Sequence, residues 1–214
     1  MIRVSAFRWV PPFARGLVRD LRVRWALQEA GLPYEERLIG PEDQTSDGYR
    51  RLQPFGQVPA EDGLVLFESG AIVLHIAAKS EALSPKDEAG RARVTTWVIA
   101  ALNSIEPQVM DLILVDVFHK GEAWTKEHRP QAEAAVVERL TALSAWLDGK
   151  QYLEGDRFTA GDLMMTTVLR ELVDSGLLAR FPNLDAYRQR CEARPAFGRA
   201  LEAQLKPFRE NAPA

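Results

Sequence analysis

Residues 56–69 determine how the chain folds, and they read GQVPAEDGLVLFES. Two short apolar segments, 58–60 and 64–67, flank Asp62 and Gly63. A glycine at this place predicts a β-hairpin, because it accepts a positive φ at no steric cost. Pro59 has no N–H to give to a strand ladder, so its strand is expected at a sheet edge. Val58 beside it would then offer free backbone groups to an extended peptide.

A helix is expected directly after the hairpin, over residues 71–79, with Ser69 at its N-terminus. The N–H groups and the dipole at a helix start favour an anion. A backbone edge beside such a helix start is suited to bind a small acidic peptide. Taken alone, the same residues equally fit an ordinary hairpin and helix of an α/β domain.

The composition is that of a globular protein with one or two domains: 214 residues, 46% of them hydrophobic and 27% charged. A net charge of -3 gives no reason to expect nucleic acid or an anionic membrane as a partner. No apolar run approaches the ~20 residues that span a bilayer. The first residues lack the apolar core of a signal peptide, and the single cysteine, Cys191, cannot form an internal disulfide. We therefore expect a cytoplasmic protein.

The first part of the chain alternates strands and helices. Strands are predicted over residues 2–9 and 34–39, with a helix between them from about residue 13 or 17 to residue 30. A helix-length connection favours a parallel pair of strands. One face of this helix is apolar, and its other face is basic. The basic residues are Arg15, Arg19, Arg22 and Arg24. With a short helix near 49–52, this order of elements predicts a thioredoxin-like domain over residues 1–80.

From residue 84 onward the pattern is helical only. Pro107 is expected to kink or break the first long helix. Pro130 is expected to start another helix, and Pro182 and Pro195 the last two. The sequence therefore predicts a second, all-helical bundle domain over residues 84–214. The three histidines show no metal-ligand spacing, so no metal is expected.

A second informative stretch begins at Thr159, which fits an N-cap, with Asp162 at N3 of a capping box. Together with Gln57-Val58-Pro59 and Glu68-Ser69, it resembles the cytosolic glutathione S-transferase family in motif order and spacing. The likeness is to the bacterial type and covers nearly the whole chain. It implies a glutathione-binding first domain with Pro59 in the cis form, and a helical second domain that carries the second-substrate site.

The resemblance also implies a set of glutathione-binding residues. Val58 would pair through its backbone with the cysteinyl part of glutathione, next to Pro59. Glu68 and Ser69 would bind the γ-glutamyl amine and carboxylate, although plain helix capping would also explain this pair. Gln57 would reach the glycyl end, and Gln44 would assist from the preceding loop.

Candidates for the second-substrate site lie on the first long helix of the second domain. They are Trp97, Ala101 and Ser104. Each is as well suited to the core of the domain as to a ligand surface.

The chain departs from the family where the thiolate-stabilising group is expected. Between Phe7 and Leu21 there is no Tyr, Ser, Thr or Cys, so the loop after the first strand is atypical. Arg15 could stabilise a thiolate by its charge, and the Trp9 indole N–H by a hydrogen bond. Backbone N–H groups at the first helix are a third source. A solvated helix face and a packed aromatic are the alternatives for Arg15 and Trp9.

The resemblance implies an enzyme that conjugates glutathione, as co-substrate, to small hydrophobic electrophiles, or reduces peroxides through the same thiolate. A detoxification role and a homodimer are implied as well. The alternative is a non-catalytic binding or assembly module with the same fold. The missing hydroxyl favours that alternative, whereas the intact binding motifs favour retained glutathione binding.

Overall fold

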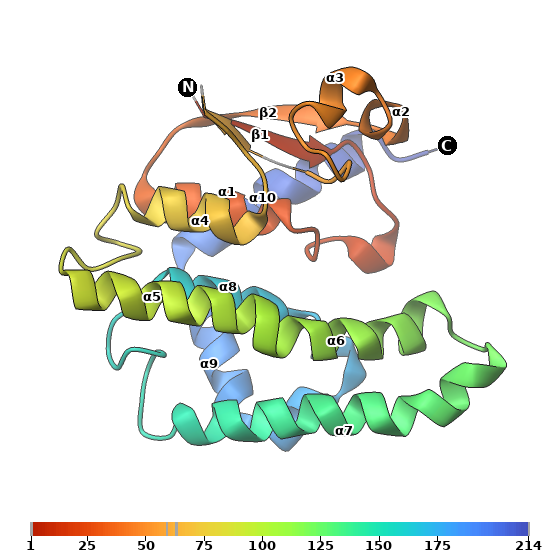
Figure 1. Cartoon of the computed structure of the whole chain (residues 1–214), viewed down its shortest axis with the longest axis vertical. Coiled ribbons are helices and arrows are strands. Elements are labelled where there is room, and N and C mark those ends of the chain that lie inside the picture. The colour runs from red at the N-terminus through yellow and green to blue at the C-terminus, as the bar shows by residue number, and fades with distance from the viewer. Residues whose placement is uncertain (1, 59, 63, 214) are drawn as a thin grey trace. The chain divides into compact units, whose positions relative to one another are not determined.

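The computed structural model describes residues 2–58, 60–62 and 64–213, and of residues 60–62 it describes the backbone only. The chain divides into two compact units (Figure 1). One comprises Met1–Asp87 together with Glu192–Ala214, and the other comprises Glu88–Cys191. The sequence-based division placed everything after residue 84 in the helical half. In the structure, the last residues, Glu192–Ala214, are instead grouped with the first unit.

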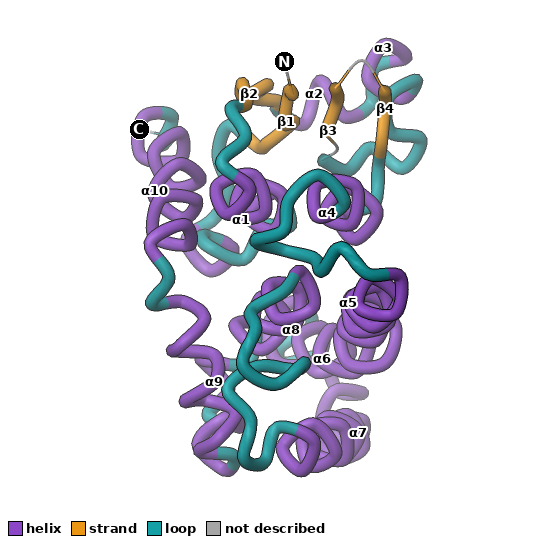
Figure 2. Tube along the Cα trace, turned by 90° about the vertical axis from the view of Figure 1, so that its left-hand side faces the viewer, coloured by secondary structure: helices purple, strands orange, loops and turns teal. Residues whose placement is uncertain are grey.

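The first unit is built on a four-stranded sheet in the order β2-β1-β3-β4 (Figure 2). Its strands are β1 (Ile2–Phe7), β2 (Tyr34–Ile39), β3 (Ala60–Asp62) and β4 (Leu64–Leu66). β1 and β2 are parallel, as expected, whereas β3 runs antiparallel to both β1 and β4. The hairpin is therefore present, with strand β3 starting at Ala60; Gly63, at the expected turn, lies outside the described residues.

Two helices, α1 (Asp20–Ala30) and α4 (Ser69–Ala77), lie side by side on one face of this sheet (Figures 1 and 2). Two short helices follow β2: α2 (Pro41–Gln44), within the segment where a loop was expected, and α3 (Asp47–Arg50), close to the short helix predicted near residues 49–52. α1 is shorter than predicted: a 3-10 turn over Pro12–Ala14 precedes it, and Gly16 adopts a φ of 78°, which interrupts a right-handed helix.

The last helix, α10 (Pro195–Glu210), packs against α1 although it is distant in sequence. Phe197 meets the fully buried Trp25 edge to face, with 4.9 Å between the ring centroids. Arg194 forms an ion pair with Glu29 at 2.6 Å. This apolar and ionic contact explains why residues 192–214 belong to the first unit.

The second unit is a bundle of helices around α8 (Ala160–Arg170). The others are α5 (Glu88–Ala100), α6 (Glu106–Ile113), α7 (Ala123–Trp146) and α9 (Pro182–Glu192), with 3-10 turns at Val173–Ser175 and Leu177–Arg180. Every residue of α8 up to Leu169 is buried, as expected of a central helix. The predicted capping box is confirmed: the Asp162 carboxylate accepts the Thr159 N–H at 2.8 Å.

The expected interruption at Pro107 takes the form of a π-helical turn over Ala101–Ile105. The Glu106 N–H donates to the Ala101 carbonyl, five residues back, and the wider turn accommodates a proline at the start of α6. A second π-helical turn, Leu114–Phe118, ends the segment. α5 and α6 thus form one continuous helix from Glu88 to Phe118 instead of two broken pieces.

This joined helix, Glu88–Phe118, is long and apolar enough by composition to cross a bilayer, which no single apolar run in the sequence suggested. Of its most apolar window, 39% is buried inside the protein. A buried core helix passes the same test of length and composition. Val94, Val98 and Val109 on this helix are fully buried, so part of its apolar surface is used for packing.

α7 begins at Ala123, earlier than the predicted start at Pro130. Glu122 adopts an extended conformation as its N-cap, and Pro130 lies inside the helix. A proline there removes one backbone hydrogen bond without ending the helix. The prediction was wrong because proline is favoured in the first turn but not restricted to it.

Candidate functional site

The start of α4 is built in a strained conformation. Glu68, its N-cap, has φ 69° and ψ 115°, and it is the only non-glycine residue with positive φ in the described ranges. Such a conformation costs on the order of 1–3 kcal/mol and is concentrated at ligand sites. The Glu68 side chain is exposed and does not cap the helix. Plain helix capping therefore does not explain this residue.

Ser69, the first residue of α4, contacts a buried cation from the neighbouring helix. The Arg22 Nη1 donates to the Ser69 Oγ at 3.2 Å, and Arg22 is only 2% exposed. A guanidinium at a helix start adds to the positive end of the helix dipole. The corner is therefore suited to a carboxylate.

The loop that leads into the hairpin is fixed by side chains of α2 and α3. The Gln44 Nε2 donates to the Gly56 carbonyl at 2.6 Å, and the Tyr49 hydroxyl donates to the Gln57 carbonyl at 2.5 Å. Gly56 itself requires a positive φ, of 69°. These bonds hold the backbone of Gln57 and Val58 in place, while the Gln57 side chain is exposed.

The Val58 backbone takes part in none of the loop and turn hydrogen bonds within the described part of the chain. Free backbone groups in an ordered loop are what an extended peptide needs for strand-like pairing. Pro59, the next expected binding residue, lies outside the described residues. Gln44 acts first as a support for the loop, because its side-chain amide is bonded to Gly56.

Trp9 and Arg15 both lie between β1 and α1. The Trp9 Nε1 is buried and has no hydrogen-bond partner among the residues described. A buried donor left without a partner costs about 1–3 kcal/mol. The Arg15 Nε donates to the Val10 carbonyl at 3.5 Å, and Arg15 ends the 3-10 turn. The solvated-helix alternative for Arg15 is wrong, because α1 begins only at Asp20.

Two of the arginines predicted on the basic face of the first helix, Arg22 and Arg24, are buried. Arg24 is fully buried and is bonded to Asp20 at 2.6 Å and to Glu36. Burial alone would lower the pKa of the Arg24 guanidinium, but the two carboxylates raise its pKa, so it stays charged. Gln204 of α10 donates to the same Asp20 carboxylate at 2.6 Å. Arg24 thus joins α1 to β2, and Arg22 contacts the start of α4; hydrophobic periodicity alone revealed neither contact.

The three proposed second-substrate residues do not share one surface. Ala101 is fully buried, whereas Ser104 is exposed. The Trp97 Nε1 donates to Glu154 at 2.9 Å, and the indole lies tilted against that of Trp146, with 5.2 Å between the ring centroids. The π-helical turn explains the difference, because it rotates the residues after Ala101 out of the register of a regular helix.

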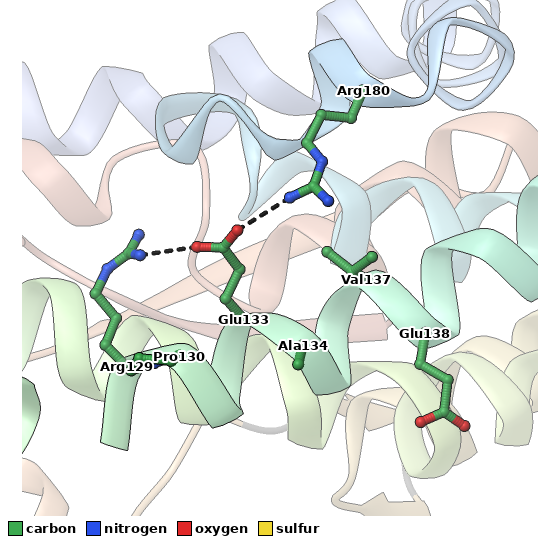
Figure 3. A pocket seen from close by; sticks show the side chains of 7 residues that line it. All are labelled: Arg129, Pro130, Glu133, Ala134, Val137, Glu138 and Arg180. Carbon is green, nitrogen blue, oxygen red and sulfur yellow. Dashed lines mark hydrogen bonds and ion pairs between the residues drawn. The ribbon is translucent and has the colours of Figure 1, made fainter. Parts of the chain in front are cut away.

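The helical unit also has a cavity of about 590 Å³ (Figure 3). It is lined by Arg129, Pro130, Glu133, Ala134, Val137, Glu138 and Arg180. Glu133 lies between two guanidiniums and binds Arg129 at 2.8 Å and Arg180 at 2.9 Å. Arg129 also pairs with Asp116 at 2.7 Å. Each cation that lines this cavity already faces a carboxylate, so the cavity offers no unpaired cation to an anionic ligand.

Comparison with known proteins identifies the family. Two family models match the chain and together cover more than half of it: the glutathione S-transferase N-terminal domain over residues 14–78, and the glutathione S-transferase C-terminal domain over residues 105–195. Glutathione S-transferase F11 of Arabidopsis thaliana is 35% identical over 167 residues, which are 70% of this chain and 76% of the relative. Glutathione S-transferase 3 of Zea mays is 32% identical over 209 residues, 86% of this chain and 88% of the relative.

Solved structures agree with these relatives. A glutathione transferase of Burkholderia graminis, with two glutathione molecules bound per subunit, superposes with a TM-score of 0.83. It is 28% identical, and the match covers 94% of this chain and 88% of that one. The fold is therefore a thioredoxin-like domain followed by helices, as the sequence predicted. This chain belongs to the glutathione S-transferase family.

Proposed function

We propose that this protein is a glutathione transferase that conjugates the glutathione thiolate to small hydrophobic electrophiles, and that reduces peroxides through the same thiolate. The observation that carries the proposal is the strained start of α4, where Glu68 and Ser69 lie beside the buried Arg22. A strained, exposed carboxylate next to a cation suits a ligand with both an amine and a carboxylate.

In this proposal, glutathione binds along the loop and the start of α4. Val58 pairs with the cysteinyl backbone, and Pro59 follows it in the same segment. Glu68 accepts from the γ-glutamyl amine, and Ser69 donates to the γ-glutamyl carboxylate. Gln57, exposed at the loop, reaches the glycyl end, with Gln44 supporting the loop from behind. Glutathione structures of similar proteins from Burkholderia graminis and Pseudomonas fluorescens support this ligand.

We propose Trp9 and Arg15 as the groups that stabilise the thiolate. The buried Trp9 indole N–H lacks an acceptor within the described residues, and a thiolate would supply one. Arg15 uses one N–H on Val10 and keeps its positive charge, which favours a thiolate by Coulomb attraction. Arg15→Ala should then raise the thiol pKa of bound glutathione. Trp9→Phe should do the same if the indole is the donor.

The second substrate is proposed to bind near Ser104, the exposed member of the three expected residues. Trp97 and Ala101 would act behind it as packing residues, since both face the helical unit. A cytoplasmic detoxification role and a homodimer complete the proposal. The alternative is a non-catalytic binding or assembly module, which the absence of Tyr, Ser, Thr and Cys between Phe7 and Leu21 favours.

Calorimetric titration with glutathione, followed by thiolate absorbance against pH on the same sample, tests the proposal. Binding with a lowered thiol pKa is the expected result. Binding with an ordinary thiol pKa would favour the non-catalytic alternative. No binding at millimolar glutathione would reject the proposed substrate while leaving the fold unchanged.

A further inference from the structure

We infer that Gln204 of α10 is a positioning residue for the thiolate, because it holds the loop between β1 and α1 in place. The inference rests on the proposed function, since this loop carries Trp9 and Arg15. The Gln204 Nε2 donates to the Val18 carbonyl at 3.0 Å and to the Asp20 Oδ1 at 2.6 Å. Gln204 and Val18 are 186 residues apart in sequence.

The orientation of the Gln204 amide is fixed by its partner in the loop. A backbone carbonyl can only accept, so the amide nitrogen must face Val18. The Gln204 Oε1 is then buried, and it has no hydrogen-bond partner within the described part of the chain. A buried acceptor without a partner is unfavourable. The amide is therefore placed for the two bonds that its nitrogen donates.

The loop that Gln204 contacts has little regular structure of its own. Residues 11 and 12 are prolines, which have no N–H to donate. Gly16 adopts a φ of 78°, which turns the chain before α1 begins at Asp20. Val18 lies between this turn and the helix. The bond from Gln204 therefore fixes the end at which the loop joins α1.

The two proposed thiolate-stabilising residues depend on the course of this loop. The Arg15 Nε donates to the Val10 carbonyl at 3.5 Å, and only two residues separate Arg15 from Val18. Trp9 precedes Val10 directly. A catalytic group must lie at a precise distance from the reacting atom, and small displacements lower the rate steeply. Gln204 thus acts on the thiolate through Arg15 and Trp9, without touching glutathione.

α10 is a suitable anchor, because it is itself fixed on α1. Phe197 meets Trp25 edge to face, and Arg194 pairs with Glu29. The Gln204 side chain is 1% exposed, so few other orientations are open to it. A group that positions a site needs such support from packed neighbours.

Gln204→Met tests the inference, because it nearly keeps the length of the side chain and removes both donated bonds. With glutathione and chlorodinitrobenzene, kcat/KM should fall about tenfold at a pH below the thiol pKa of bound glutathione. The loss should shrink as the pH rises above that pKa, because the thiolate then forms without stabilisation. The affinity for S-methylglutathione, which has no thiol, should equal that of the wild type.

Phe197→Leu is the matched control. It weakens the packing of α10 on α1 about two helical turns before Gln204 and leaves the loop contact in place. Thermal unfolding should show a less stable protein. Its pH profile of kcat/KM should keep the shape of the wild-type profile.

A second variant separates the loop contact from the contact between helices. Asp20→Asn combined with Gln204→Glu exchanges the amide and the carboxylate, so the two side chains still bond and the local charge is kept. A carboxylate cannot donate to the Val18 carbonyl. The double variant should therefore show the same altered pH profile as Gln204→Met. It provides the test if Gln204→Met does not fold.

A wild-type pH profile in a folded Gln204 variant, or the same loss at every pH, would overturn the role of Gln204 while leaving the proposed function intact. A wild-type protein that does not bind glutathione, or that binds it with an ordinary thiol pKa, would reject the proposed function and this inference with it.

Discussion

Glu68 has a strained backbone conformation and lies in the candidate glutathione site at the start of α4. Its left-handed backbone conformation is unfavourable for any side chain, yet it carries an exposed carboxylate at a helix start. A protein optimised for stability alone would place glycine there. We therefore propose that the Glu68 carboxylate binds the amine of the ligand, and that this binding role explains why a strained residue is kept at this position.

Two substitutions of Glu68 separate its effect on glutathione binding from its effect on the stability of the fold. Glu68→Gly and Glu68→Ala both remove the carboxylate, and both should weaken glutathione binding. Only glycine relieves the positive φ, so Glu68→Gly should be more stable than Glu68→Ala by about 1 kcal/mol. Urea unfolding midpoints and calorimetry measure the two effects. A Glu68→Ala protein as stable as the glycine variant would show that the backbone is not strained.

Tyr49 is a second residue with a measurable signature. Burial raises its pKa to about 12, despite the opposing effects of Ser5 and Arg37. The folded state thus favours the neutral phenol. Its contribution to stability is complete below the unfolded pKa of about 10, and is lost as the pH rises from there through about 12.

Difference spectra near 295 nm between the wild type and Tyr49→Phe should reveal one phenol that ionises close to pH 12. Because the Tyr49 hydroxyl donates to the Gln57 carbonyl, the variant should also loosen the loop and weaken glutathione binding. A difference spectrum that rises near pH 10 would contradict the assignment.

At the scale of elements, the ion network of Asp20, Arg24 and Glu36 ties α1 to β2. Gln204 extends it to α10 by donating to Asp20. A buried ion pair is weak evidence of net stabilisation, but removal of one partner leaves a buried charge alone. The network thus makes the junction of the three elements sensitive to single substitutions.

Asp20→Ala should therefore destabilise the protein by about 3–5 kcal/mol, because the Arg24 guanidinium loses its buried partner. Glu36→Ala is the control, since Glu36 is about one-third exposed and water can replace its carboxylate. Its effect should be smaller. Denaturant unfolding of both variants gives the comparison, and equal losses would argue against a dominant role for Asp20.

At the scale of the whole molecule, the N-terminal and C-terminal segments belong to one unit, because α10 packs on α1. The same unit leaves apolar side chains exposed around β4, the edge strand of the sheet. Leu64, Val65 and Phe67 are 54%, 42% and 37% exposed, and Phe55 is 65% exposed beside Phe67. Exposed apolar residues at a sheet edge mark an interaction surface. They support the proposed homodimer.

Phe55→Glu should shift the proposed dimer toward monomer, because it places a charge within this apolar surface. Light scattering coupled to gel filtration measures the mass at several protein concentrations. Phe13→Glu, at another exposed phenylalanine of the same unit, is the control and should leave the mass unchanged. An unaltered dimer in the Phe55 variant would move the interface elsewhere.

The sequence by itself determined the order of elements, the parallel β1–β2 pair, the hairpin and the capping box at Thr159 and Asp162. These features depend on local rules: side-chain periodicity, turn residues and helix caps. It also placed Glu68 and Ser69 at a helix start, because glycine and serine mark the end of one element and the beginning of the next.

Only the tertiary structure decided which residues support that helix start. Arg22 looked like part of a solvated basic face, and nothing local shows that it reaches Ser69 on another helix. The pairing of Arg24 with Glu36 and the packing of α10 on α1 were hidden for the same reason. Each depends on groups far apart in sequence, whose energies are set by burial and by one another. Local patterns contain no information about such contacts.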